Sequence, residues 1–310
     1  FMIQEVKACL NATRIKDPLA VLSVAGSSVI VREAKLPALA PEELEKTLSF
    51  EAEPFIPFDI KEVNLDYHII GNVTEEGQGK YEALLIAAKK DLIENRLAIL
   101  TAAGVSPIIV DVDAFAVANL LKLVPSVAEE TVVVVNIGAT ITNLAILEKG
   151  APRVVRDVAV AGSAFTRALQ NVLNMEAAAA EQAKKETGII LDEDQKAKLT
   201  EAGDNQKLQI SQTLCAVATD LLGEVNKSTD FYLTHGTDRL INRIYLCGGG
   251  ALLKNLIPFA AGQLKAQVEL LNPFDLMQLP SGSAVAHEMG PMFGVACGLA
   301  LRQWNDWKKT

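Results

Sequence analysis

Residues 131–147 read TVVVVNIGATITNLAIL and constrain the fold more than any other stretch of the chain. Four consecutive valines indicate a β-strand that is buried on both faces, because no polar residue interrupts the run and β-branched side chains favour strands. The stretch then turns at Gly138 and continues as a second apolar strand. A sheet with two buried faces needs helices on both sides, so we expect an α/β fold.

Composition agrees with this expectation and excludes several classes of protein. Hydrophobic residues make up 50% of the chain but aromatic residues only 5%, which favours an aliphatic core of the α/β type. The net charge is -9 and no long basic cluster occurs, so nucleic acid is not an expected partner. No run of eighteen apolar residues predicts a membrane span.

The cysteines and histidines argue against a metal site. The four cysteines are widely separated and form no CxxC pair, which is typical of reduced thiols in a cytoplasmic protein. The three histidines show no spacing that would suit zinc or iron. We therefore expect no metal ion held by protein ligands alone.

The pattern along the chain predicts three kinds of segment. Residues 19–90 read as a small α+β unit, with two β-runs around Gly26 and, further on, two strands joined by a mobile loop over residues 71–80. Residues 175–240 are almost wholly helical, with a long helix from Leu208 to about Tyr232. The sequence again shows β-strand patterns after residue 240, so one half of the molecule is interrupted by a helical insertion.

Three glycines, Gly248, Gly249 and Gly250, follow the buried run IYLC and precede a predicted helix. In this context bare backbone can approach a flat ring or a phosphate, and a helix N-terminus favours negative charge. The stretch is not a Walker loop, because no GKS or GKT follows, and the GxGxxG fingerprint of dinucleotide sites is absent. Ligand contact and tight packing are both compatible with these residues.

The turn in NIGATITN is a candidate phosphate site. Gly138 leaves the backbone amides accessible, and the hydroxyl groups of Thr140 and Thr142 can donate to phosphate oxygens. An ordinary glycine turn would have the same sequence. Asn136 stands just before this turn, where a carboxylate would be expected.

Several stretches, taken together, resemble the PilM family of type IV pilus assembly proteins, which belongs to the actin-like ATPase superfamily and is related to the division protein FtsA. These stretches span nearly the whole chain in the order GSSVIVREAKLP, SFEAEPFIPFDIKEVNLDY, VVNIGATITNLAIL, GSAFTRAL, LCGGGALLKNL and GPMFGVACGLALR. The resemblance implies a two-lobe actin-like fold of the ribonuclease H type, with a small α+β subdomain and a helical insertion.

The resemblance also implies a division of the chain into parts. The first lobe is expected to be incomplete, with a helical remnant at residues 1–18, followed by the small subdomain at residues 19–107. The second-lobe core would comprise residues 108–174 and 241–310, with a helix at 114–124 that returns to the first lobe. The helical insertion would occupy residues 175–240.

Carried over from the family, the second phosphate turn falls on Asn136, Gly138 and Thr142, and the adenosine site on Gly248, Gly249 and Gly250. A Glu and a Lys three residues later hold the ribose or base in relatives, and Glu181 and Lys184 have that spacing. A simple solvated ion pair has the same spacing. The resemblance implies ATP or ADP with Mg²⁺ as the ligand of the complete protein.

Two departures from the family pattern put hydrolysis in question. The family has Asp where this chain has Asn136, and an amide brings neither negative charge to Mg²⁺ nor a general base. The first phosphate loop is not found, and VAGSSV cannot replace it, because Val24 stands in place of the Asp and is expected in a strand of the small subdomain. We expect no catalytic residue, at most weak ATPase activity, and nucleotide binding only with the missing loop restored.

The implied partner is the N-terminal peptide of a PilN-like inner-membrane protein, of the Asn-Leu-Leu-Pro type, and pilus motor components are further candidates. An exposed sheet edge rimmed by Phe55, Ile56 and Phe58 would receive this extended peptide. Alternatively, these side chains only close the core of the small subdomain. If the partner is bound, the protein would be cytoplasmic and peripheral to the inner membrane through this partner.

Two other functions remain open at this point. An actin-like sugar or acid kinase would need a catalytic Asp near a glycine turn, and Asp157 and Asp220 are the nearest candidates. The nucleotide-free cytoplasmic domain of a type II secretion L-type protein shares the same architecture, but the GGG turn argues against it.

Overall fold

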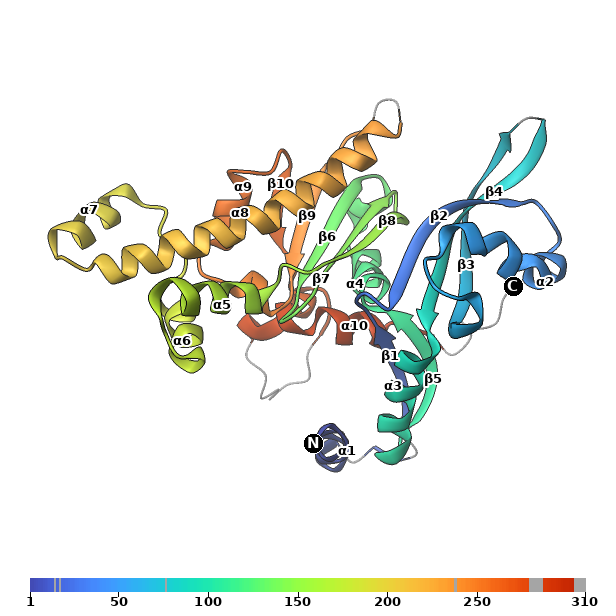
Figure 1. Cartoon of the computed structure of the whole chain (residues 1–310), viewed down its shortest axis with the longest axis horizontal. Coiled ribbons are helices and arrows are strands. Elements are labelled where there is room, and N and C mark those ends of the chain that lie inside the picture. Colours follow the sequence, from blue (N-terminus) through green and yellow to red (C-terminus); the bar gives the residue numbers. More distant parts are fainter. Residues whose placement is uncertain (14, 17, 76, 237–238, 279–286, 304–310) are drawn as a thin grey trace. The chain divides into compact units, whose positions relative to one another are not determined.

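The strands of the chain collect into three sheets in the computed structural model, which describes residues 1–13, 15–16, 18–75, 77–236, 239–278 and 287–303. Two compact units are present, one formed by Phe1–Asn119 with Gly298–Thr310 and the other by Leu120–Cys297. We refer to them as unit 1 and unit 2. Figure 1 shows the elements of each unit.

Unit 2 contains a five-stranded sheet in the order β10-β9-β6-β7-β8. Strands β6, β7 and β8 form an antiparallel meander, and β9 and β10 run parallel to β6. This order and these directions are those of the ribonuclease H-like sheet, as expected for one lobe of an actin-like fold. The bounds are β6 Thr131–Ile137, β7 Thr142–Glu148, β8 Ala151–Val158, β9 Arg243–Cys247 and β10 Gln267–Leu270.

The valine run forms β6, the central strand of this sheet. The side chains of Val132 to Val135 are at most 1% exposed. Helices pack on the sheet, and the long helix α8 (Asn205–Thr234) runs beside it in Figure 1 and contacts α5 (Gly162–Leu173) and β8. The other helices of this unit are α6 Ala177–Thr187, α7 Glu193–Glu201 and α9 Leu256–Ala261. The predicted helical segment and its long helix are both present.

Unit 1 contains an antiparallel sheet in the order β2-β4-β3 and a two-stranded parallel sheet of β1 and β5. Helix α2 packs its buried residues Leu44, Leu48 and Ala52 on one face of the β2-β4-β3 sheet. The bounds are β1 Leu19–Val24, β2 Val29–Pro37, β3 Val63–Glu75, β4 Gln78–Lys89, β5 Ser106–Val112, α1 Met2–Thr13, α2 Pro41–Ala52 and α3 Lys90–Ala102. Helices α4 Asp113–Leu120 and α10 Gly294–Ala300 lie where the chain passes from one unit to the other.

The pairing of β1 differs from the sequence-based expectation. Val24 was expected in a strand of the small subdomain, but β1 pairs with β5 and not with the β2-β4-β3 sheet. The chain turns at Gly26, whose φ of +96° lets β2 leave in another direction. The apolar run LAVLSV suits a parallel partner, which can come from far along the chain. A small subdomain that begins at residue 19 would therefore take in a strand of another sheet.

The mobile loop expected over residues 71–80 is also wrong. The antiparallel pairing of β3 and β4 continues as far as Glu75 and Gln78. Gly77 has a φ of +79°, which suits a tight turn. At this end of the hairpin, the carboxylate of Glu75 accepts hydrogen bonds from Lys35 at 2.5 Å and from Lys80 at 2.8 Å. These ion pairs fix charged residues that the sequence alone had suggested were loop.

None of the helices in the described ranges combines the length and apolar character that crossing a bilayer requires. Within the same ranges, His, Cys, Asp and Glu side chains form no group of three that could hold a metal ion.

Candidate functional site

The β6–β7 turn is fastened to the start of α5. The amide of Gly138 donates to the carbonyl of Ile141 at 3.0 Å, and the amide of Gly162 donates to the carbonyl of Gly138 at 2.9 Å. A Cβ atom on Gly162 would lie 3.1 Å from that carbonyl oxygen, so glycine eases the close approach of α5. We call residues 138–141 the hairpin turn; it is a hydrogen-bonded backbone loop at the carboxyl end of β6.

The two threonines of the hairpin region have different roles. Thr142 is buried, and its hydroxyl donates to the carbonyl of Val160 at 2.7 Å. This hydroxyl is therefore used inside the fold and is not free to bind a phosphate. Ala139 and Thr140 are exposed at the tip of the hairpin turn and present their backbone and the Thr140 hydroxyl to solvent.

The three glycines after β9 pack against the end of β6. A Cβ atom on Gly248 would lie 2.4 Å from the carbonyl oxygen of Ile137, and one on Gly250 would lie 2.2 Å from its Cγ2 atom. Gly249 is exposed, and a Cβ atom there would meet nothing closer than Met292 at 3.9 Å. The first and third glycines thus serve packing, and the middle one forms accessible surface. The structure brings this GGG segment and the hairpin turn to the same edge of the sheet.

Asn136 lies in a row of polar side chains that crosses the sheet. Its Nδ2 atom donates to Oδ1 of Asn143 at 2.8 Å, and Nδ2 of Asn143 donates to Oδ1 of Asp157 at 2.8 Å. These residues are direct cross-strand partners on β6, β7 and β8. On the other side, the thiol of Cys247 donates to Oδ1 of Asn136 at 3.7 Å. Both ends of the amide are therefore engaged within the sheet.

The protonation of this row follows from its burial. Burial raises the pKa of Cys247 to about 12, so the thiol keeps its proton and remains a donor. Asp157 accepts the last hydrogen bond of the row from Nδ2 of Asn143, so its carboxyl group is engaged within the sheet. Asp220, the other candidate for the catalytic Asp of a kinase, is exposed on α8. Neither residue lies at a glycine turn.

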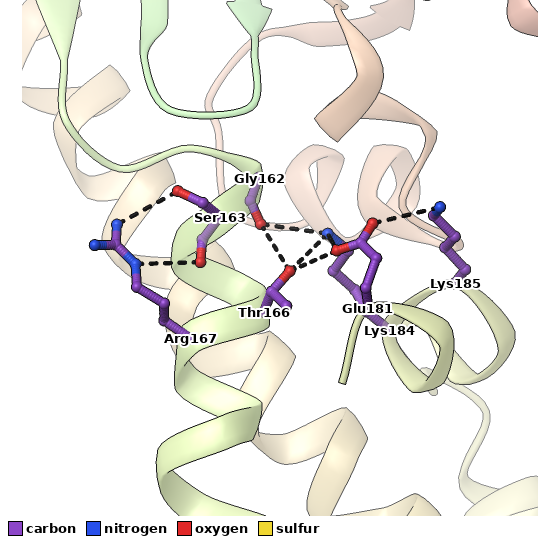
Figure 2. Close-up of polar contacts among 7 residues, drawn as sticks. All are labelled: Gly162, Ser163, Thr166, Arg167, Glu181, Lys184 and Lys185. Atoms are coloured by element: carbon purple, nitrogen blue, oxygen red, sulfur yellow. Dashed lines mark hydrogen bonds and ion pairs between the residues drawn. The ribbon is translucent and has the colours of Figure 1, made fainter. Parts of the chain in front are cut away.

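Glu181 and Lys184 form a compact network between α5 and α6 (Figure 2). Nζ of Lys184 lies 2.6 Å from Oε2 of Glu181, 3.0 Å from Oγ1 of Thr166 and 3.3 Å from the carbonyl oxygen of Gly162. Thr166 in turn donates its hydroxyl to Oε2 of Glu181 at 2.6 Å. The Lys184 side chain is only 14% exposed, so this is more than a solvated ion pair on one helix.

Two opposing effects set the charge of Glu181. Partial burial raises the pKa of its carboxyl, but hydrogen bonds from Lys184 and Thr166 and the nearby positive charges outweigh burial, so the net pKa is lowered. The carboxylate is therefore ionised at neutral pH.

Helix α6 is also tied to the chain that follows the GGG segment. The amide of Ile189 donates to the carbonyl of Lys254 at 3.0 Å, and Nδ2 of Asn255 donates to the carbonyl of Ile189 at 2.6 Å. Gly188, with a φ of +64°, permits this contact, because its Cβ atom would lie 2.4 Å from Cβ of Lys254. The hairpin turn, α6 and the GGG segment thus form one connected region of unit 2.

The residues predicted to bind a partner have unequal exposure. Ile56 is 7% exposed and belongs to the core beneath α2, and Phe58 packs against that core with Nζ of Lys89 4.9 Å from the centre of its ring. Phe55 is 39% exposed. Sequence reasoning missed Phe50, which is 76% exposed on α2. Phe50 lies two residues after the buried Leu48 and six residues after the buried Leu44, so it falls on a different face of the helix. The helical periodicity of the sequence could therefore have identified Phe50 as exposed.

Comparison with known proteins gives matches over nearly the whole chain and others over about two thirds of it. The family model described as "Type IV pilus assembly protein PilM" matches residues 2–304. A solved structure titled "PilM-PilN type IV pilus biogenesis complex" is 28% identical, with 97% of this chain and 84% of the other covered and a TM-score of 0.80. The ethanolamine utilization protein EutJ from Carboxydothermus hydrogenoformans is 18% identical over 67% of this chain and 60% of its own, with a TM-score of 0.47. MreB5 of Spiroplasma citri bound to ADP is 15% identical over 68% and 64%, with a TM-score of 0.48.

Proposed function

The chain belongs to the PilM family of type IV pilus assembly proteins, and we propose that it acts there as an actin-like scaffold that recruits the N-terminal tail of a PilN-like membrane protein. The observation that carries this proposal is the match over 97% of the chain to a PilM structure solved with PilN. The protein would work at the cytoplasmic face of the inner membrane and be held there by its partner.

We place the partner site on unit 1, at the exposed part of the segment that follows α2. An extended peptide can add to the free edge of a sheet through its backbone and insert alternate apolar side chains into neighbouring pockets. Phe55 offers exposed apolar surface in the short turn that follows α2, whereas Ile56 belongs to the core of the β2-β4-β3 sheet and Phe58 packs against that core. Binding would depend mainly on apolar burial and only weakly on salt.

A peptide titration tests this site. The probe is a fluorescein-labelled N-terminal peptide of the PilN-like protein, and fluorescence anisotropy reports its binding to the full-length protein. We expect a dissociation constant in the micromolar range or below, and loss of affinity in Phe55→Ala. Phe231→Ala is the matched control, because Phe231 is a similarly exposed phenylalanine on α8 of unit 2. No binding by the wild type, or equal effects of both substitutions, would reject the site.

We further propose that the connected region of unit 2 holds ADP or ATP. The backbone of the hairpin turn would face the phosphates, Gly249 would face the adenosine, and Glu181 and Lys184 would lie on the ribose side. Mg²⁺ would be held chiefly by the phosphates, where it would neutralise their charge. Since both ends of the Asn136 amide are engaged within the sheet, this chain brings no carboxylate to the metal from that position.

Little or no hydrolysis follows from this arrangement, because neither a general base nor a metal-binding carboxylate stands at the hairpin turn. Calorimetry with ADP tests binding, and phosphate release from ATP tests turnover. Steady phosphate release above background that Thr142→Val abolishes would contradict the proposal, since the Thr142 hydroxyl is bound to Val160. The scaffold role does not depend on this result.

A further inference from the structure

A cavity of about 180 Å³ in unit 2 lies at the turn between β7 and β8, two neighbouring strands in Figure 1. Residues of this turn and of two short 3₁₀ helices within 121–128 line it. The pairing of β6 with β7 runs from Thr131 and Glu148 at this end to Ile137 and Thr142 beside the hairpin turn. The cavity is therefore at the opposite end of these strands from the region proposed for the nucleotide.

The interior of this cavity is apolar. Leu121, Val127 and Leu147 line it and are each at most 2% exposed. Val124 and Ala128 add further apolar surface. Pockets for drug-sized ligands usually have volumes of roughly 300–1,000 Å³. The cavity is smaller than that, and its size suits a single apolar side chain of a peptide.

Two lysines also line the cavity. Lys122 and Lys149 are both exposed, and among the residues that the structure describes their ammonium groups make no hydrogen bond or ion pair. Lys149 and Gly150 form the two-residue turn, with φ of +50° and +80°. Asn or Gly is the usual first residue of such a turn, and a lysine with positive φ is uncommon. The amide of Lys149 donates to the carbonyl of Glu130 at 3.0 Å, which holds the turn beside the cavity.

The carboxylates around the cavity do not neutralise both lysines. Two of them already have arginine partners: Glu130 with Arg243 at 2.9 Å and Glu148 with Arg153 at 3.0 Å. The exposed Glu129 brings one negative charge against the two ammonium groups. The rim thus keeps a local positive charge on a protein whose net charge is -9. An acidic ligand complements this rim, and a basic ligand does not.

We propose that the cavity receives one apolar side chain of an acidic segment in a partner protein, while carboxylates that flank this side chain pair with Lys122 and Lys149. Burial of the apolar anchor supplies most of the affinity. The two lysines select a segment whose flanking residues are acidic. The site uses no residue of the peptide site proposed on unit 1 and none of the region proposed for the nucleotide.

A titration of the full-length protein with defined peptides, followed by nuclear magnetic resonance, tests this site. The probe is acetyl-Glu-Glu-Leu-Glu-Glu-amide, and the signals followed are the backbone amides of Ala128 and Gly150, which line the cavity. One buried side chain with surface ion pairs should give a dissociation constant of about 1 mM. The absence of saturable shifts at these amides would overturn the proposal.

Two matched peptides separate the anchor from the charges. One has Ser in place of Leu, and the other is acetyl-Lys-Lys-Leu-Lys-Lys-amide. Neither should give saturable shifts at the cavity. Binding of the serine peptide as tight as that of the probe would show that the anchor has no role, and equal binding of the lysine peptide would show that the rim has none. Either result contradicts the proposal.

Substitutions test the same two contributions from the side of the protein. Lys122→Gln and Lys149→Asn each remove one charge, and Asn suits the left-handed backbone at position 149. Each should weaken binding about two- to fivefold, as expected for surface ion pairs, and the difference from wild type should shrink in 0.5 M NaCl. Ala128→Met fills the cavity from an exposed position and should abolish binding without lowering Tm. Wild-type affinity in Ala128→Met, or in the double lysine variant, would contradict the proposal.

Lys198→Gln is the matched control. Lys198 is exposed on α7 and makes no side-chain ion pair within the described ranges, so this variant makes the same charge change away from the cavity and should bind as wild type. Equal weakening in Lys198→Gln and Lys122→Gln would mean that only the overall charge matters, and it would reject the assigned rim. Circular dichroism of each variant checks folding.

A second copy of this chain is the alternative occupant, and sedimentation velocity distinguishes it. Self-association that rises with concentration and is abolished by Ala128→Met would assign the cavity to a contact between copies and overturn the proposal. We expect the sedimentation of wild type and of Ala128→Met to be the same.

Discussion

Substituting Gly248 and Gly249, the first two glycines of the GGG segment, should affect stability very differently, although the residues are adjacent. Gly248 has φ of +85° and ψ of 167°, a backbone conformation that only glycine adopts readily. Its Cβ atom would also lie 2.4 Å from the carbonyl oxygen of Ile137 and 2.7 Å from Oδ1 of Asn136. The backbone atom cannot move without disturbing β6. Gly249 has neither constraint, because the nearest atoms belong to the Met292 side chain at 3.9 Å.

The expected magnitude for Gly248→Ala combines two costs. The strained backbone costs about 1–3 kcal/mol, and insertion of a methyl group into packed structure costs another 1–3 kcal/mol. We therefore expect Gly248→Ala to lower the free energy of unfolding by about 3 kcal/mol. This corresponds to a fall in Tm of roughly 6–12 °C for a unit of this size. Gly249→Ala should change the free energy of unfolding by less than about 0.5 kcal/mol.

Thermal and urea unfolding of both variants, monitored by far-ultraviolet circular dichroism, measure this difference. Gly249→Ala should keep the wild-type Tm but bind ADP more weakly, because its methyl group lies on the accessible surface proposed for the adenosine. Equal stability of the two variants would refute the packing argument. Wild-type ADP affinity in Gly249→Ala would reject the adenosine placement and leave packing as the role of the segment.

Three other predictions concern stability and pH. Asn136→Asp should destabilise the protein by about 2 kcal/mol at pH 7, because a buried carboxylate would face Oδ1 of Asn143. The loss of stability should be smaller at pH 4.5, where the new carboxyl group binds a proton. Urea unfolding at both pH values checks this. Glu75→Gln should lower Tm at pH 7 but not at pH 2. Hydrogen bonds from Lys35 and then Lys80 hold the pKa of Glu75 at about 2, below the usual 4.5, so its contribution is present above pH 4.5 and is lost as the pH falls towards 2; a difference that persists at pH 2 would contradict this. Ile56→Ala should cost about 2–4 kcal/mol in urea unfolding, and an effect below 1 kcal/mol would mean that Ile56 is not a core residue.

The sequence was most informative where local pattern and burial coincide. The valine run predicted a doubly buried strand, and β6 is the central strand of its sheet. The family resemblance is confirmed by the family model over residues 2–304. The long helix was predicted close to its bounds because its apolar residues recur at helical spacing over many turns.

Long-range pairing could not be predicted in the same way. The partner of β1 lies some eighty residues away in β5, and parallel pairing leaves no turn signal between two strands. The roles of Lys184 and Thr142 depend on acceptors from other segments, the carbonyls of Gly162 and Val160. Spacing placed Glu181 and Lys184 on one face of a helix but could not show that the ammonium group is already saturated.

The scaffold role is tested most directly by site-specific photo-crosslinking in cells that assemble the pilus. Replacing Phe55 with the photoreactive analogue benzoylphenylalanine should give a crosslink to the N-terminal tail of the PilN-like protein on illumination. The same replacement at Phe231, which is also exposed but lies on α8, should give none. Equal yields at both positions, or no crosslink at position 55 while the partner is present, would contradict the account.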